Sequence, residues 1–255
     1  MPSPHLPPEL EYEIFILALE NNHKDGKNLI LVAKRVFDWL IPRIFRVVLL
    51  HSTRSIPIKF NKAAHERYGH YVEHLFIEPN EQGKYIGLFP NAKNLVLWTD
   101  YNSTYVKSLL TLPLTRLSIA PSDLHPPSLE LFQVFSKLTH LDLVSMASCW
   151  GTHLDIVKEL LHLPKLTHLC VMRGFSAKTL ELFLDRSRCP KLRVVILWEF
   201  SDNEAYLEKG GFPGVYDDGR VLRIKCQPLR DWEVGARGGV DMWKLADSIM
   251  ASRTT

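Results

Sequence analysis

One stretch of this chain comes back almost unchanged. Residues 137–143 read KLTHLDL and residues 165–171 read KLTHLCV, so the sequence contains an internal repeat. Written as apolar-x-x-apolar-x-apolar, the unit recurs along most of the chain, with a weaker last copy at GRVLRI. The central apolar residues of the copies are Leu75, Leu95, Leu117, Leu141, Leu169, Val195 and Leu222. Successive centres are 20 to 28 residues apart, and a period of this kind predicts a stack of similar units.

The period and the pattern together indicate the fold class. Leucine-rich repeats recur at roughly 20 to 29 residues, and in a strand with the pattern L-x-L both apolar side chains point to one face. We therefore predict an α/β fold, a solenoid resembling leucine-rich repeats, with about seven to eight parallel strands and with helices on its convex side. The alternative is an ordinary α/β domain whose strands share a generic apolar alternation.

Short amphipathic segments separate the strand units. We expect convex-side helices at residues 104–112, 128–135, 154–163 and 177–187. Pro113, Pro164 and Pro190 stand just before the next strand, where a proline ends the helix. No asparagine follows the strands at the position where many leucine-rich repeats have one, so the repeats are degenerate.

The residues between the inward leucines form a second row, which a stack of parallel strands turns into a concave surface. This row is rich in large apolar side chains, and large aromatic residues dominate the energetics of protein interfaces. The residues predicted to bind a substrate protein there are Phe76, Trp98, His140, His168, Met172, Ile196 and Trp198. On the last strand the same register places Val221, Arg223 and Lys225 on this face. The alternative is that the carboxy-terminal segment or a long loop covers the row.

The first 50 residues show helical periodicity instead. Pro7 suits the start of a helix, because a proline there gives up only an N–H that would be unpaired. Leu10 and Ile14 follow at helical spacing. A second helix is expected at about residues 29–40, since the residue before Pro42 is pushed out of the helical region.

These two helices resemble an F-box, a short helical motif with the pattern L-P-x-E, then I-[LF], then a leucine-valine-cysteine-lysine stretch and a tryptophan. The matching stretches are LPPELEYEIF at residues 6–15 and LILVAKRVFDWLIPRIFRVVLL at residues 29–50. Ala33 stands where the family commonly has cysteine, and the aromatic position is shifted to Phe37 and Trp39. The order of motifs also resembles short fungal F-box proteins with degenerate repeats.

The resemblance implies a partner and a role. F-box proteins bind the Skp adaptor of a cullin-based ubiquitin ligase and hold a substrate protein for it, without transferring ubiquitin themselves. The adaptor contacts that the resemblance assigns are Leu6, Pro7, Glu9, Leu10, Ile14, Val32 and Trp39. The alternative is a ligase-independent binding or scaffold protein, in which these helices only cap the solenoid, as every solenoid requires.

The predicted domain organisation has four parts. They are a tail at residues 1–5, the F-box-like segment at 6–50, degenerate leucine-rich repeats at 51–230 and a C-terminal capping turn and helix at 231–255. The apolar face of the last helix would consist of Met242, Leu245, Ala246 and Ile249. We expect this face to seal the final repeat.

Composition and motifs exclude several other classes of protein. The chain is 46% hydrophobic and 23% charged, which is typical of a soluble globular protein. It shows neither a secretory signal nor an apolar run of membrane-spanning length, so we expect a cytoplasmic or nuclear protein without membrane contact. The four cysteines contain no C-x-x-C pair. No metal, cofactor or catalytic motif is found, so we expect a non-enzymatic protein without cofactors.

Residues 34–67 form a basic stretch. They contain eight Lys or Arg against two Asp or Glu, although the net charge of the whole chain is only +3. Such a stretch favours an acidic protein partner or nucleic acid, and a solvated helix face is the alternative. The single Arg-Gly-Gly at residues 237–239 adds little, so we do not expect a nucleic-acid partner.

Overall fold

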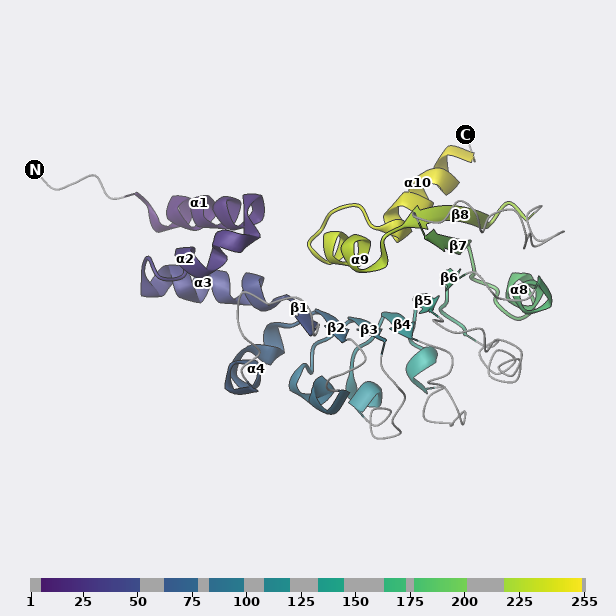
Figure 1. Ribbon diagram of the computed structural model, residues 1–255, viewed down its shortest axis with the longest axis horizontal. Helices are drawn as coiled ribbons and strands as arrows, with labels where there is room; N and C mark the ends of the chain where they lie inside the picture. Colours follow the sequence, from purple (N-terminus) through teal and green to yellow (C-terminus); the bar gives the residue numbers. More distant parts are fainter. Residues whose placement is uncertain are drawn as a thin grey trace, which may run out of the picture.

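The computed structural model describes residues 6–50, 62–77, 83–98, 108–119, 133–144, 163–172, 177–200 and 218–253 (Figure 1). Within these ranges, strands β1 to β8 form one sheet in which every neighbouring pair is parallel. The strands are β1 (Val47–Leu50), β2 (His74–Ile77), β3 (Asn94–Leu97), β4 (Arg116–Ile119), β5 (His140–Leu143), β6 (His168–Met172), β7 (Val194–Phe200) and β8 (Val221–Cys226). Their spatial order follows the chain order, so the predicted stack of parallel strands is confirmed.

The central residues of the repeat lie opposite one another across the sheet. Leu75 pairs with Leu95, and the row continues through β4, β5 and β6 to Val195 in β7. These side chains are buried in the main hydrophobic core, which lies between the sheet and its convex-side helices. Burial of each leucine contributes roughly 1.5–3 kcal/mol. The predicted register is therefore confirmed from β2 to β7.

The register predicted for the last strand is wrong. β7 and β8 pair Ile196 with Leu222, which places Leu222 on the concave face instead of in the main core. Val221 lies in the main core. Arg223 and Lys225 alternate with the concave-face residues and are exposed. A slip of one residue exchanges the two faces of a strand, and both alternations are present in this short sequence.

Short helical segments cover the convex side of the sheet (Figure 1). They are α4 (Lys62–Tyr68), η2 (Gly69–Tyr71), η3 (Gly83–Leu88) and α8 (Ala177–Leu184). α8 confirms the helix expected at residues 177–187. Helical residues 108–111 and 133–135 belong to two further expected helices, whose other parts fall outside the described residues. Almost all of the helix expected at 154–163 also falls outside them.

Three threonines form a ladder at the start of neighbouring strands. The Thr139 hydroxyl donates to the carbonyl oxygen of Thr115 at 3.1 Å, and the Thr167 hydroxyl donates to that of Thr139 at 3.0 Å. Thr115 makes the same bond, at 3.3 Å, with the carbonyl oxygen of Lys93. The ladder ties together the starts of β3, β4, β5 and β6.

Helices α1 (Pro8–Asn21), α2 (Gly26–Leu29) and α3 (Lys34–Phe45) precede the sheet, with η1 (His23–Asp25) between the first two. α1 begins directly after Pro7, as predicted. α3 differs from the prediction, because Ala33 is extended and the helix then continues through Pro42. A proline inside a helix removes one backbone hydrogen bond. Ile41 and Phe45, on either side of it, are buried, and this burial offsets the loss.

Two C-terminal helices, α9 (Pro228–Ala236) and α10 (Met242–Arg253), lie across the concave side of the sheet (Figure 1). We call them the cap. The predicted last helix is confirmed as α10, although Leu245 of its predicted apolar face is exposed. In the turn before α10, Gly238 has a φ of 96°, which favours glycine. α10 does more than seal the final repeat, because Trp243 and Ala246 pack on the concave residues of β6 to β8. No helix in the described ranges is both long and apolar enough to cross a membrane.

Candidate protein-interaction surfaces

The first helix has two apolar faces, and only one of them is packed. Ile16 and Leu19 are buried against α3. The other face presents Leu10, Ile14 and Leu17 at the spacing of successive helical turns, and each of these residues is more than half exposed. A surface helix normally turns its apolar stripe toward a core. The exposed stripe of α1 is therefore a candidate contact surface for another molecule.

Six of the seven predicted adaptor contacts are exposed, and Trp39 is the exception. Its ring meets that of Tyr12 edge to face, with the ring centroids 5.7 Å apart, in the small core between α1 and α3. The exposed large apolar residues of this region form a group that we call the N-terminal apolar set. It consists of Leu6, Leu10, Ile14, Leu17, Leu31 and Val32.

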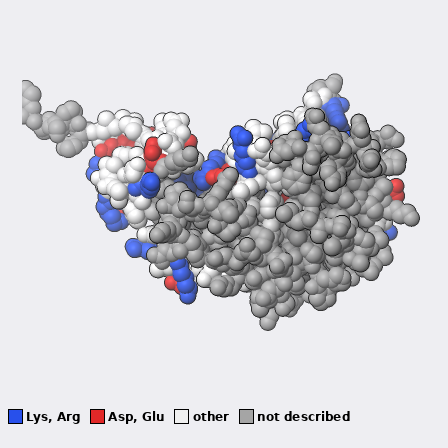
Figure 2. Space-filling model, viewed as in Figure 1, with Lys and Arg blue, Asp and Glu red and all other residues white. Residues whose placement is uncertain are grey.

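The basic stretch at residues 34–67 is partly neutralised by nearby acids. Lys34 forms an ion pair with Asp38, and Arg35 donates two hydrogen bonds of 2.8 Å to Glu11. Figure 2 shows Lys and Arg side chains of the N-terminal helices interspersed with Asp and Glu. This arrangement is typical of solvated helix faces, and it gives no support to a nucleic-acid site.

The concave face is largely covered by the cap. We expected the seven predicted substrate contacts to be exposed, and for four of them this is wrong. The four buried residues are Phe76, His168, Ile196 and Trp198. Ile196 and Trp198 pack with Trp243 of α10 in a second hydrophobic cluster. Trp98 and His140 are half-buried, and nothing is described of the Met172 side chain. The alternative in which the carboxy-terminal segment covers this row is the correct one.

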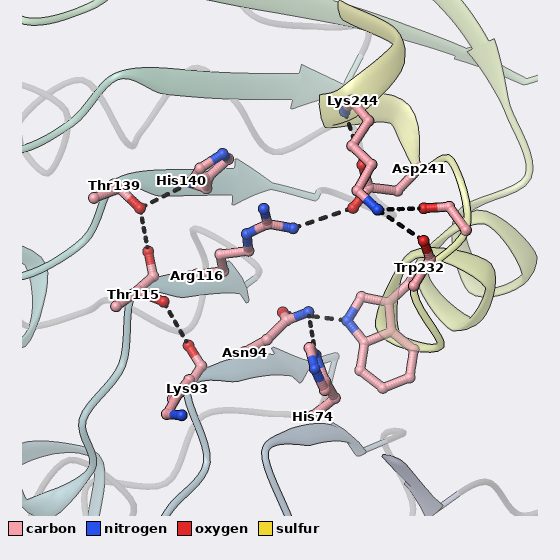
Figure 3. A network of polar contacts seen from close by, with 12 residues as sticks. His74, Lys93, Asn94, Thr115, Arg116, Thr139, His140, Trp232, Asp241 and Lys244 are labelled. Atoms are coloured by element: carbon pink, nitrogen blue, oxygen red, sulfur yellow. Dashed lines mark hydrogen bonds and ion pairs between the residues drawn. The ribbon is translucent and has the colours of Figure 1, made fainter. Parts of the chain in front are cut away.

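Polar contacts fasten the cap to the strands (Figure 3). Arg116 Nη1 lies 3.1 Å from Asp241 Oδ2, and the Trp232 indole N–H donates to Asn94 Oδ1 at 3.3 Å. The second carboxylate oxygen of Asp241 accepts a 2.8 Å hydrogen bond from the backbone N–H of Lys244, which caps the first turn of α10. These contacts fix the cap in one position on the concave face.

Two histidines stack beneath α10. The rings of His140 and His168 are parallel with their centroids 4.3 Å apart, and Trp243 meets both edge to face. Burial lowers the pKa of His140 to about 2, with a smaller contribution from the neighbouring His168 and Arg116. Burial also lowers the pKa of His168, although Asp247 Oδ1, 3.0 Å from Nε2, acts in the opposite direction. The lowered pKa values favour neutral imidazole rings, so these two histidines are suited to packing under Trp243 and not to proton transfer.

A small cavity remains between the cap and the strands, and we call it the cap cavity. Its volume is about 40 Å³. The aromatic side chains on its walls are Phe76, Trp98, Trp198, Trp232 and Trp243. Three of these, together with His140, belong to the predicted substrate contacts. The structure therefore brings four of the predicted residues together, in a pocket instead of an open groove.

Asp142 also lies on the wall of the cap cavity. Burial raises the pKa of this carboxyl to about 6, and hydrogen bonding to Ser118 and the Cys170 thiol partly opposes the shift. We did not predict Asp142 as a site residue. The sequence did contain a sign of it. Among the aligned central concave residues of β2 to β7, Asp142 is the one charged side chain, and the others are Phe76, Val96, Ser118, Cys170 and Ile196.

Comparison with known proteins adds one weak similarity. No protein-family model and no curated protein matches the chain. Among solved structures, the chain is similar to the leucine-rich repeat-containing protein LegL7 from Legionella pneumophila, with a TM-score of 0.35 and 18% identity over 50% of this chain. The match spans about half, 48%, of that protein. Independently of this match, the eight parallel strands in chain order form an α/β architecture that is consistent with a solenoid resembling leucine-rich repeats.

Proposed function

We propose that the protein is a non-catalytic interaction module that serves as a substrate-recognition subunit of a Skp-cullin-F-box ubiquitin ligase. Its N-terminal helices would dock the Skp-type adaptor, and its repeats with the cap would hold a substrate protein. One observation carries the proposal. Of the nine exposed large apolar residues among those described, six belong to the N-terminal apolar set, where the F-box resemblance expects the adaptor contacts.

The exposure of these residues matches what an adaptor surface requires. Ile14 is 54% exposed and Val32 is 63% exposed, although burying such a side chain is favourable by roughly 1.5–3 kcal/mol. Exposed apolar groups that gather in one region mark sites of protein contact. Arg35 and Glu11 link α3 to α1, so the helices that carry the set have a fixed relation.

A ligase-independent scaffold protein is the second candidate, and the packing of α3 favours it. Phe45 at the end of α3 contacts Tyr68 of α4, with ring centroids 4.9 Å apart, so α3 covers the first repeat as a solenoid cap does. Capping accounts for the buried face of α3. It does not account for the exposed stripe on α1, which faces away from the small core of these helices.

Binding of the purified full chain to a Skp-type adaptor, measured by calorimetry, tests the proposal. We expect Ile14→Asp to weaken binding at least about tenfold, a loss of about 1.4 kcal/mol, without lowering the melting temperature. Leu245→Asp is the matched control, since Leu245 is an exposed apolar residue outside the N-terminal apolar set. Failure of the unaltered chain to bind the adaptor would leave the scaffold as the better account.

A further inference from the structure

The walls of the cap cavity point to one class of ligand. Five aromatic side chains surround it, and aromatic faces attract cations through their quadrupoles. A volume of about 40 Å³ has room for about three water molecules. The cavity is therefore large enough for a small head group, and too small for a nucleotide or a sugar. Trp98, Trp232 and Met242 on its walls are half-buried, so it is not sealed from solvent on every side.

The charges on the walls leave two carboxylates without a counter-charge in the described part of the chain, and they differ in their hydrogen bonds. Three acids, Asp142, Asp231 and Asp241, and one base, Arg116, line the cavity. Arg116 pairs with Asp241 at 3.1 Å. Asp231 Oδ2 accepts a 2.8 Å hydrogen bond from the backbone N–H of Gln227. The carboxylate of Asp142 has no cationic partner within the described residues.

Asp142 is held in place by a chain of hydrogen bonds. The Trp98 indole N–H donates to Ser118 Oγ at 3.0 Å, and Ser118 Oγ donates to Asp142 Oδ2 at 2.7 Å. Asp142 is only 8% exposed, and its Oδ1 has no hydrogen-bond partner in the described part of the chain. A buried acceptor without a donor is costly. A ligand with N–H donors and a positive charge would satisfy both the oxygen and the charge.

We propose that the cap cavity binds an alkylammonium group of the size of a lysine head group, with Asp142 Oδ1 as its acceptor and the tryptophans as its walls. This inference rests on the proposed function where it identifies the ligand as a lysine side chain of a substrate protein. A free small amine has the same head-group chemistry and is the other possible source. Either ligand would enter past the half-buried edge of Trp98 or Trp232.

Other ligand classes fit the cavity less well. An anion would face the carboxylate of Asp142, while the guanidinium of Arg116 is already paired. Calcium takes six to eight oxygen ligands and magnesium six, and no group of three or more His, Cys, Asp or Glu side chains within the described ranges is placed to hold a metal ion. A neutral ligand could donate to Asp142 Oδ1 but would leave its negative charge without compensation. An internal water is the simplest competing occupant.

Titration of the full chain with blocked lysine, Nα-acetyl-lysine N-methylamide, tests the inference, with Nα-acetyl-norleucine N-methylamide as the uncharged control. Binding is followed by calorimetry and by the NMR signal of the Trp98 indole N–H. We expect blocked lysine to bind with a dissociation constant on the order of millimolar and to shift that signal. Asp142→Asn should weaken this binding at least about tenfold, and Trp98→Leu should also weaken it. Asp185→Asn, an exposed carboxylate outside the cavity, should leave it unchanged.

The outcomes separate the possible occupants. Binding of methylammonium but not of blocked lysine would assign the cavity to a free amine and overturn its role in substrate recognition. Equal binding of the norleucine control, unchanged binding by Asp142→Asn, or no binding of either amine would overturn the inference and leave an internal water only. Adaptor binding is measured separately. Loss of the adaptor interaction with intact lysine binding would refute the ligase proposal alone, and the reverse result would refute this inference alone.

Discussion

Arg116 in β4 and Asp241 at the start of α10 form an ion pair across 125 residues of sequence. Their charged atoms, Arg116 Nη1 and Asp241 Oδ2, lie 3.1 Å apart, and Asp241 is 7% exposed. The Arg116 side chain is 32% exposed, so the pair is partly buried, and removing one partner leaves a partly desolvated charge without compensation. This pair therefore decides how firmly the cap is held on the concave face.

Asp241→Ala is expected to destabilise the protein by about 1–3 kcal/mol, because it leaves the partly exposed Arg116 unpaired and removes the N-terminal cap of α10. Denaturant unfolding measures the effect. Lys93→Ala is the control, since its exposed pair with Glu73 should contribute about 0–1 kcal/mol. In a double-mutant cycle with Arg116→Ala, a coupling energy near zero would contradict a direct interaction across the cavity.

Asp142→Asn should change the dependence of stability on pH. The pKa of Asp142 is raised to about 6 in the folded protein, against about 3.9 when unfolded, because burial disfavours the charged form. Between these values the folded state binds the extra proton, so the wild-type chain loses stability as the pH rises from about 4 to about 6. The variant lacks this loss. It should gain up to about 3 kcal/mol relative to wild type at pH 7, and almost nothing near pH 4.

Denaturant unfolding of both chains at several pH values checks this expectation. The half-buried histidines His74 and His140 contribute a slope of the opposite sign, because partial burial is the main cause that lowers the pKa of His74 to about 4 and that of His140 to about 2. Both chains share these groups, so the difference between the chains isolates Asp142. Parallel pH profiles for the two chains would show that the carboxyl titrates normally.

Gly69→Ala should be strongly destabilising. A Cβ atom at Gly69 would lie 2.1 Å from the carbonyl oxygen of Leu88, a backbone atom that cannot swing away. Overpacking of this kind costs about 1–3 kcal/mol or more. Gly87 is the matched control, because a Cβ there meets nothing within 4 Å, and Gly87→Ala should be neutral or slightly stabilising. Similar melting temperatures for both variants would exclude the close approach at Gly69.

Leu141→Ala tests the register of the repeat. Leu141 is fully buried in the main core, so its truncation should cost about 2–5 kcal/mol. Lys137, four residues earlier in the same repeat, is exposed, and Lys137→Ala should change stability by less than about 0.5 kcal/mol. Thermal or denaturant unfolding of the two variants provides the comparison. A smaller loss for Leu141→Ala than for Lys137→Ala would contradict the burial of Leu141 in the main core.

Strand order and most of the register could be predicted because they depend on local pattern. Each copy of the repeat places its central apolar residue at the same position, and neighbouring copies align when those residues share a core. At β8 the pattern is ambiguous, since Val221 and Leu222 are both apolar. The choice between them depends on α10, which covers the concave side of that strand.

Local sequence pattern could not decide whether the concave face is covered. Contacts such as that between Trp243 and His140 join residues far apart in the sequence. Periodicity within one repeat carries no information about them. The apolar character of the concave row was itself the signal, because exposed tryptophans are as consistent with an intramolecular cover as with a partner.

The cap also changes how this solenoid should unfold. In a simple repeat array each unit touches only its neighbours, so terminal units can be lost one at a time. Here Arg46, before β1, donates to the carbonyl oxygen of Ala236 at 3.2 Å, while His168 in β6 contacts Asp247. The cap therefore contacts both the first and the later repeats. Opening either end disturbs the other, which favours a single cooperative transition over stepwise fraying.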